Sequence, residues 1–193
     1  MVSSSKIMAI CLTFSLMTAV GYAQTQVVDN TTAKKEEQRA KELQEATELM
    51  QQFAREASKE RLIEMTGKLI APREVGEKVF SADMAARLSS EYVKAWESGQ
   101  IILAGKPGQT EVLLTPATTD ELITWSGEAA KTLAGGWKRL QKHVHPGFTI
   151  YTIRFVEPGE DIGMRFDGLI KIDDKWYIFP KAWRLAPEEN EPE

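Results

Sequence analysis

The spacing of apolar residues along this chain changes near residue 147, from about 3.6 residues to 2. Before that point apolar side chains recur at steps of three and four, the period of amphipathic helices. After it, apolar and polar residues alternate as in half-buried strands, over residues 147–156, 162–172 and 175–183. Turn-forming residues separate these segments at 157–160 and 173–174. The pattern predicts an α+β fold, with N-terminal helices packed on a curved antiparallel sheet that ends in a three-stranded meander.

The first predicted helix covers residues 33–66 on a charged background without proline. Its apolar stripe is Leu43, Ala46, Met50, Phe53 and Ala57, and after a small shift it continues with Leu62, Met65 and Leu69. A coiled-coil assembly element is the alternative interpretation, and it would make a homodimer. Because coiled coils need three or four sustained heptads and this stripe slips near Glu60, packing within the domain is favoured.

Two further helices have recognisable ends. Ser81 is a candidate N-cap for a helix that reaches Ser98, with Gly99 as its stop. Thr118 and Glu121 fit a capping box that opens a helix running to the glycines at 135–136. Between these helices, residues 101–104 and 111–114 resemble two short strands around a turn, which predicts a small hairpin.

Strand alternation predicts which side chains face the core. In the middle strand of the meander one face carries Ile162, Met164, Phe166, Gly168, Ile170 and Ile172. If Asp173 and Asp174 form a two-residue loop, the last strand adds Tyr177, Phe179 and Trp183 to that face. A loop one residue longer would turn Trp176 and Ile178 inward instead, and the sequence leaves both registers open.

Residues 1–23 have the three parts of a secretory signal peptide: a short polar start with one positive charge, an apolar run over 7–20, and small residues Gly21 and Ala23 before a cut. The apolar run spans about 21 Å as a helix, short of a hydrocarbon core of about 30 Å. We therefore expect export to the periplasm or medium, with no membrane anchor after cleavage.

The lone cysteine, Cys11, lies inside this predicted signal. Cleavage would leave a cysteine-free chain, which excludes disulfides and thiol chemistry. The remainder divides into a flexible lead over 24–32, one domain over 33–186, and an acidic tail over 187–193 that we expect to be disordered. A net charge of −4 argues against a nucleic-acid partner, because such proteins carry a basic stripe.

The closing hairpin reads Phe-Asp-Gly-Leu-Ile-Lys-Ile-Asp-Asp-Lys-Trp-Tyr-Ile over residues 166–178. With the preceding helices, it resembles the nuclear-transport-factor-two-like, or ketosteroid-isomerase-like, superfamily, whose small secreted bacterial members end in such an acidic turn followed by Lys-Trp. The resemblance implies a cone-shaped fold that binds small molecules, catalyses isomerisation or dehydration, or pairs with partners through its sheet. A fold of this kind is compatible with each of these functions, so it does not identify one of them.

Candidate chemical groups are few. The enzymes in that superfamily use a carboxylate base with a tyrosine donor, for which Asp167, Tyr151 and Tyr177 are the residues of the right type. Asp167 falls beside Arg165 on the polar face, where a surface ion pair is the simpler interpretation. His143 and His145 have a spacing that suits zinc or copper, but no third ligand has an obvious spacing. We therefore predict no catalytic residue, no metal site and no cofactor.

The prediction that follows is an exported, non-catalytic domain that binds a small apolar ligand or a protein partner. The candidate binding residues lie on the inner face of the sheet: Phe166, Tyr177, Phe179 and Trp183. Basic residues concentrate in the same region, at Arg154, Arg165, Lys171, Lys181 and Arg184. An anionic ligand could use them, although cations on a polar sheet face usually serve solubility. The alternative is a small-molecule enzyme of isomerase or dehydratase type with a cone-shaped pocket.

Overall fold

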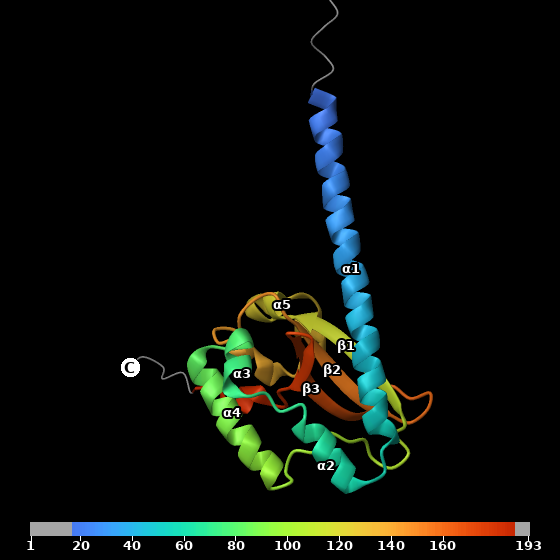
Figure 1. Cartoon of the computed structure of the whole chain (residues 1–193), viewed down its shortest axis with the longest axis vertical. Helices are drawn as coiled ribbons and strands as arrows, with labels where there is room; N and C mark the ends of the chain where they lie inside the picture. The colour runs from blue at the N-terminus through green and yellow to red at the C-terminus, as the bar shows by residue number, and fades with distance from the viewer. Residues whose placement is uncertain (1–16, 188–193) are drawn as a thin grey trace, which may run out of the picture. The chain divides into compact units, whose positions relative to one another are not determined.

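The structure, a computed structural model, describes the backbone of residues 17–187 and the side chains of residues 33–187 (Figure 1). Its helices are α1 (Met17–Arg55), α2 (Lys59–Gly67), α3 (Arg73–Val79), α4 (Ala82–Glu97), α5 (Thr119–Thr124) and α6 (Gly127–Thr132). Its strands are β1 (Glu111–Thr118), β2 (Thr149–Val156), β3 (Gly163–Ile172) and β4 (Lys175–Ile178), with 3-10 helices η1 (Gly135–Leu140) and η2 (Ala182–Leu185). The chain divides into two compact units, residues 1–41 and residues 42–193. No helix in the described part of the chain is both long and apolar enough to cross a membrane.

The strands form one antiparallel sheet in the order β1-β2-β3-β4. α5, α6 and η1 connect β1 to β2, and the remaining strands follow one another as the predicted meander. The helices α1 to α4 all precede the sheet in the chain. The predicted α+β class is confirmed.

The turn between β3 and β4 is the two-residue loop that the favoured register requires. Ile172 pairs with Lys175 and Ile170 with Tyr177. Asp173 and Asp174 both have positive φ, 48° and 61°, as a type I′ hairpin turn demands. The alternative register, with a longer loop, is therefore wrong.

A β-bulge at Gly168 divides the predicted inner row in two. The partner of Tyr151 is Leu169, whereas the partner of Thr152 is Asp167, so Gly168 has no partner on β2. One extra residue moves every later side chain to the other face of the sheet. Phe166 therefore packs on one face, and Ile170 on the other.

The start of the predicted row differs as well. Ile162, which the alternation places in the core, is 86% exposed in the turn before β3. Ile162 fits the alternation of the strand, but β3 begins only at Gly163, so Ile162 lies outside the sheet.

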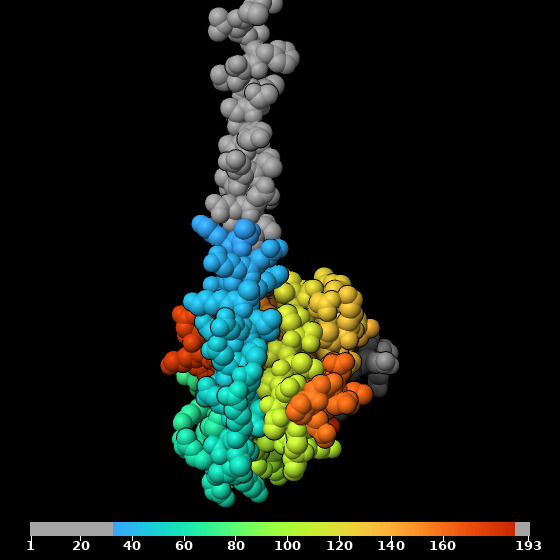
Figure 2. Space-filling model, turned by 90° about the vertical axis from the view of Figure 1, so that its right-hand side faces the viewer, coloured from blue at the N-terminus to red at the C-terminus, as the bar shows by residue number. Residues whose placement is uncertain are grey.

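Apolar side chains form a separate core on each face of the sheet. One face packs against α3, α4 and the connecting helices, with a core that includes Phe80, Met84, Leu88, Trp137, Ile150, Ile170 and Phe179. The other face packs against residues 42–55 of α1 and against α2, with a core that includes Ala46, Met50, Phe53, Leu103, Tyr151, Ile153 and Leu169. Figure 2 shows this second layer from outside, with α2 and the last turns of α1 beside the green segment that leads into β1.

The single helix predicted over 33–66 is interrupted. α1 already includes residues 24–32, the expected flexible lead, and ends at Arg55, while α2 begins at Lys59. Ser58 separates them in an extended conformation, and its side chain accepts a hydrogen bond from the Arg61 amide as the N-cap of α2. The shift in the apolar stripe marks this break.

The sequence predicts the ends of the later helices more accurately than it predicts the strands between these helices. α4 has Ser81 as N-cap position and Ser98 as C-cap, and α5 has the complete capping box of Thr118 and Glu121. The helix opened by Thr118 is nevertheless interrupted at Trp125, a residue with φ 49° that ends α5 before α6 begins.

The hairpin predicted over 101–114 does not form. Residues 101–104 belong to no strand, because the Leu103 amide donates instead to the Thr66 hydroxyl at 3.0 Å, and β1 pairs along its whole length with β2. The last strand is also shorter than predicted. It ends at Ile178 rather than Trp183, and Trp183 lies in η2.

Candidate functional site

A pocket of about 420 Å³ lies at the edge of the sheet, beside the first half of β3. Residues 100–102 before β1, residues 164–167 of β3 and the segment after β4 line it, together with Ala134 between α6 and η1. Its lining residues are Gln100, Ile101, Ile102, Ala134, Met164, Arg165, Phe166, Asp167, Pro180, Lys181 and Trp183. Its volume falls within the range of small-molecule sites, and its lining is mainly apolar, as in such sites.

The pocket exists because β4 is short. β4 pairs only with residues 169–172 of β3, and the chain leaves the sheet after Phe179, whose amide donates to the Gly168 carbonyl at 2.9 Å. The first half of β3 therefore has an open edge beside the pocket. On the other side of β3, which faces β2, the Met164 amide donates to Gln109 Oε1 at 3.2 Å.

Each wall of the pocket is held by a hydrogen bond from a helix. On one side, the Thr66 hydroxyl of α2 accepts from the Leu103 amide, which fixes the segment carrying Ile101 and Ile102. On the other, the Tyr92 phenol of α4 donates to the Pro180 carbonyl at 3.0 Å. Burial raises the pKa of the Tyr92 phenol well above its usual range, so the phenol remains a donor at neutral pH.

Lys181 lies at the rim of the pocket in a left-handed conformation, with φ 54°. Such a conformation costs a non-glycine residue about 1–2 kcal/mol, and residues of this kind cluster at binding sites. The side chain is exposed, and among residues 33–187, whose side chains the structure describes, none forms a hydrogen bond or ion pair with its ammonium group.

The carboxylate of Asp167 is fully engaged at the back of the pocket. Its Oδ1 accepts from Arg165 Nε at 2.8 Å and from the Thr152 hydroxyl at 3.0 Å, and its Oδ2 accepts from the Ala134 amide at 3.3 Å. Arg165 also donates to the Thr132 carbonyl. The side chain of Asp167 is only 4% exposed, so the surface ion pair expected from the sequence is instead a buried one that joins β3 to the end of α6.

The structure brings together two of the four predicted binding residues. Phe166 and Trp183 both line the pocket. Phe179 is buried in the core at 1% exposure, where its ring contacts Phe80 edge-on, and Tyr177 packs on that same core away from the pocket. The opposite wall, formed by Ile101 and Ile102, is not predicted from the sequence, because the pattern of these residues indicates a hairpin strand.

The candidate catalytic groups do not converge. Tyr151 is buried in the core beneath α1, Tyr177 packs on the opposite face of the sheet, and all the acceptor bonds of Asp167 are directed at structural partners. No general base and oxyanion donor of this set share a cavity.

The two histidines lie on either side of a residue that forms a backbone bridge to another segment. His143 and His145 flank Val144, which forms an isolated antiparallel bridge with Phe80, and the His145 amide donates to the Val79 carbonyl at 2.7 Å. His143 Nδ1 lies 3.5 Å from the Ser81 hydroxyl. Within the described residues, no group of three or more His, Cys, Asp or Glu side chains is placed to hold a metal ion.

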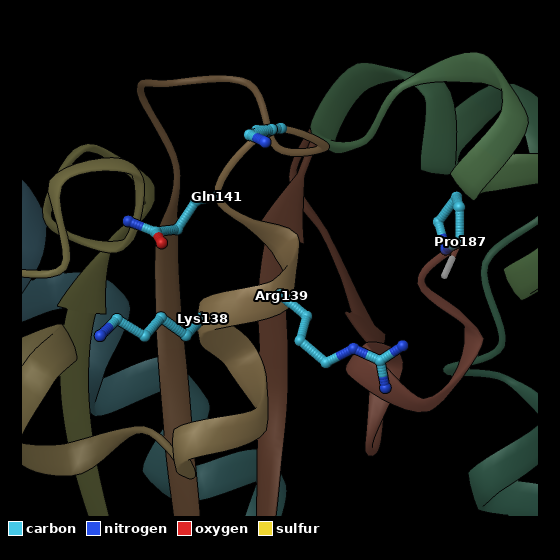
Figure 3. Close-up of a pocket in the computed structure, with 5 residues that line it drawn as sticks. Lys138, Arg139, Gln141 and Pro187 are labelled. Carbon is cyan, nitrogen blue, oxygen red and sulfur yellow. The ribbon is translucent and has the colours of Figure 1, made fainter. Parts of the chain in front are cut away.

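A second cavity, of about 450 Å³, lies around η1 and is lined by Lys138, Arg139, Gln141, Lys142 and Pro187 (Figure 3). Its polar groups diverge. Lys138 and Gln141 point to one side, where the Lys138 ammonium lies 5.9 Å from the Trp125 ring and Gln141 donates to the Ile123 carbonyl, while Arg139 points toward Pro187. The β3 pocket is therefore the better candidate site.

Comparisons with known proteins add no relative. No family model, curated protein or solved structure matches this chain. The resemblance of residues 166–178 to the nuclear-transport-factor-two-like superfamily stays a prediction from sequence.

Proposed function

We propose that this chain is an exported, non-catalytic domain that binds a small apolar ligand in the β3 pocket. The observation that carries the proposal is the pocket itself: a cavity of about 420 Å³ beside an open strand edge, with an apolar lining from Ile101, Ile102, Met164, Phe166 and Trp183. A protein partner is the other class of ligand that the sequence leaves open. A concave cavity between two walls favours a small molecule over a flat protein surface.

Export rests on residues 1–23, of which residues 1–16 lie outside the described part of the chain. The expected product is a chain that begins at Gln24, recovered from the periplasm or medium. Intact-mass measurement tests it, and a full-length, membrane-retained product would contradict it.

Ligand binding is tested with N-phenyl-1-naphthylamine, an uncharged apolar dye that fluoresces in apolar surroundings. Ile102→Asn places an amide in the pocket wall, and we expect it to weaken dye binding at least tenfold. Ile162→Asn is the matched control, because Ile162 is exposed outside the pocket. Equal binding by wild type and both variants, or no binding by the wild type, would refute the proposal.

A further inference from the structure

The β3 pocket adjoins the edge of β3 rather than one of its faces. All of residues 164–167 line the pocket, although successive side chains of a strand point to opposite faces. Met164 and Phe166 pack on the core that α2 covers, whereas Arg165 and Asp167 form the ion pair that reaches the end of α6. The pocket therefore continues the sheet, in the place that β4 would occupy if it extended past Ile178.

The register with β2 determines which backbone groups of β3 face that strand. Met164 pairs with Phe155, and Phe166 pairs with Ile153. The Phe155 carbonyl points toward β3, because a Cβ on Gly163 would clash with its oxygen. Since the backbone groups along an antiparallel strand point alternately to its two sides, those of Met164 and Phe166 face β2.

Arg165 lies between these two residues, so its N–H and its carbonyl point away from β2, toward the open edge. β4 does not reach them, because its pairing with β3 begins at Leu169. Within the part of the chain that the structure describes, neither group has a hydrogen-bond partner outside the strand ladder. One donor and one acceptor of the same residue therefore remain on the side of the pocket.

An extended peptide can bond to both groups of Arg165 at once. In an antiparallel pair, one residue donates its N–H to the residue opposite and accepts a hydrogen bond from it through its carbonyl. The two neighbours of that peptide residue would direct their side chains to the face of Ile102, Met164 and Phe166, which is apolar. This combination of main-chain bonds and alternate side-chain contacts is how peptides bind by strand addition.

The peptide residue opposite Arg165 would direct its side chain to the other face. Ala134 and Trp183 line the pocket there, and the Arg165–Asp167 ion pair is neutral as a whole. A charged side chain would find no opposite charge free to compensate it, so an uncharged residue suits this position.

We infer that the ligand of the β3 pocket is a short, uncharged peptide in extended form. It adds a strand antiparallel to β3, with one residue paired to Arg165 and an apolar residue on each side of that one. This inference rests on the proposed function, because it names the ligand class of the same pocket. It goes beyond that function in requiring main-chain hydrogen bonds.

The test uses acetyl-leucyl-threonyl-leucinamide and two forms of it that each carry one N-methyl group. Methylation of the threonine nitrogen removes the N–H that would pair with Arg165, whereas methylation of the second leucine nitrogen removes an N–H that would point away from β3. Calorimetry with the wild-type protein measures the affinity of each peptide. We expect the threonine-methylated form to bind at least tenfold more weakly than the parent peptide, and the leucine-methylated form to bind as tightly as the parent.

Two variants of the protein locate the binding. Ile102→Asn changes the pocket wall and should weaken binding of the parent peptide at least tenfold. Ile162→Asn, at an exposed position outside the pocket, should leave the affinity unchanged. Equal affinity of the two variants for the peptide would contradict binding in this pocket.

The outcomes separate the two claims. Wild type that binds N-phenyl-1-naphthylamine but not the peptide, or that binds both methylated peptides equally, would overturn the peptide inference and leave apolar binding intact. Binding of neither the dye nor the peptide would overturn both. Sedimentation provides a further check, because a dimer that the peptide dissociates would assign this edge to a second copy of the chain and overturn the inference.

Discussion

The phenol of Tyr92 donates a hydrogen bond to the carbonyl oxygen of Pro180, 88 residues later in the chain. The ring that carries it is buried and lies 6.4 Å from the ring of Phe179. Because Pro180 precedes Lys181, this bond ties the helical layer to the rim of the pocket. A change in α4 is thereby coupled to the geometry of the candidate site.

Tyr92→Phe should lower the free energy of unfolding by about 1–2 kcal/mol, because it removes the hydrogen-bond donor from the partly buried Pro180 carbonyl and leaves the ring in place. Urea denaturation measures this. Tyr177→Phe is the matched control, since the Tyr177 hydroxyl forms no hydrogen bond within residues 33–187, whose side chains are described, and its loss should cost little. Equal stability of the two variants would contradict the role assigned to the Tyr92 bond.

Alkaline pH should destabilise the wild type more than Tyr92→Phe. The pKa of the buried Tyr92 phenol is raised, so above about pH 10 the unfolded chain releases this proton while the folded chain retains it. The unfolded state then binds fewer protons, and the free energy of unfolding falls as pH rises, by up to about 1.4 kcal/mol per pH unit. Denaturation between pH 8 and 11 tests this. Parallel profiles for the two proteins would refute it.

The sequence predicts the α+β class, the ends of α4, the capping box of α5 and the two-residue turn after β3, because each depends on neighbours in the chain. It does not predict that residues 101–104 join no strand, since the Leu103 amide donates to the hydroxyl of Thr66, far away in sequence. The sequence does not predict the bulge at Gly168 either, because the alternation of apolar and polar residues continues through it. Only the pairing of β3 with β2 shows the extra residue. The pocket depends on both features, so only Phe166 and Trp183 of the predicted set line it.

Gly168→Ala should cost about 3 kcal/mol or more. Gly168 has φ 101°, and a Cβ there would lie 2.5 Å from the Phe179 carbonyl oxygen, so the bulge cannot accept alanine without moving β4. Gly159→Ala is the control, because Gly159 has φ 81° but nothing within 4 Å of its Cβ position. It isolates the dihedral cost, about 1–2 kcal/mol. Thermal denaturation that gave equal losses would argue against a tightly packed bulge.

Thr66→Val should cost about 1–3 kcal/mol and weaken dye binding, because it leaves the buried Leu103 amide without an acceptor and loosens the pocket wall that follows Ile102. Thr66→Ser retains the hydroxyl and should preserve most of the binding. Chemical denaturation and dye titration on the same samples provide both readouts. If valine and serine behaved alike, the hydrogen bond would not be what positions this wall.

Phe166→Ala separates a binding role from a core role. Phe179 is almost completely buried, so Phe179→Ala should cost about 3–5 kcal/mol, the usual range for a core phenylalanine. Phe166 is only partly buried, contacts Phe155 edge-on at 6.0 Å and lines the pocket, so its loss should cost about 1–2 kcal/mol. We expect Phe166→Ala to remain folded at 25 °C and to lose binding of N-phenyl-1-naphthylamine. A folded Phe166→Ala protein that bound the dye as tightly as wild type would exclude this residue from the site, and a loss of stability as large as that of Phe179→Ala would place it in the core instead.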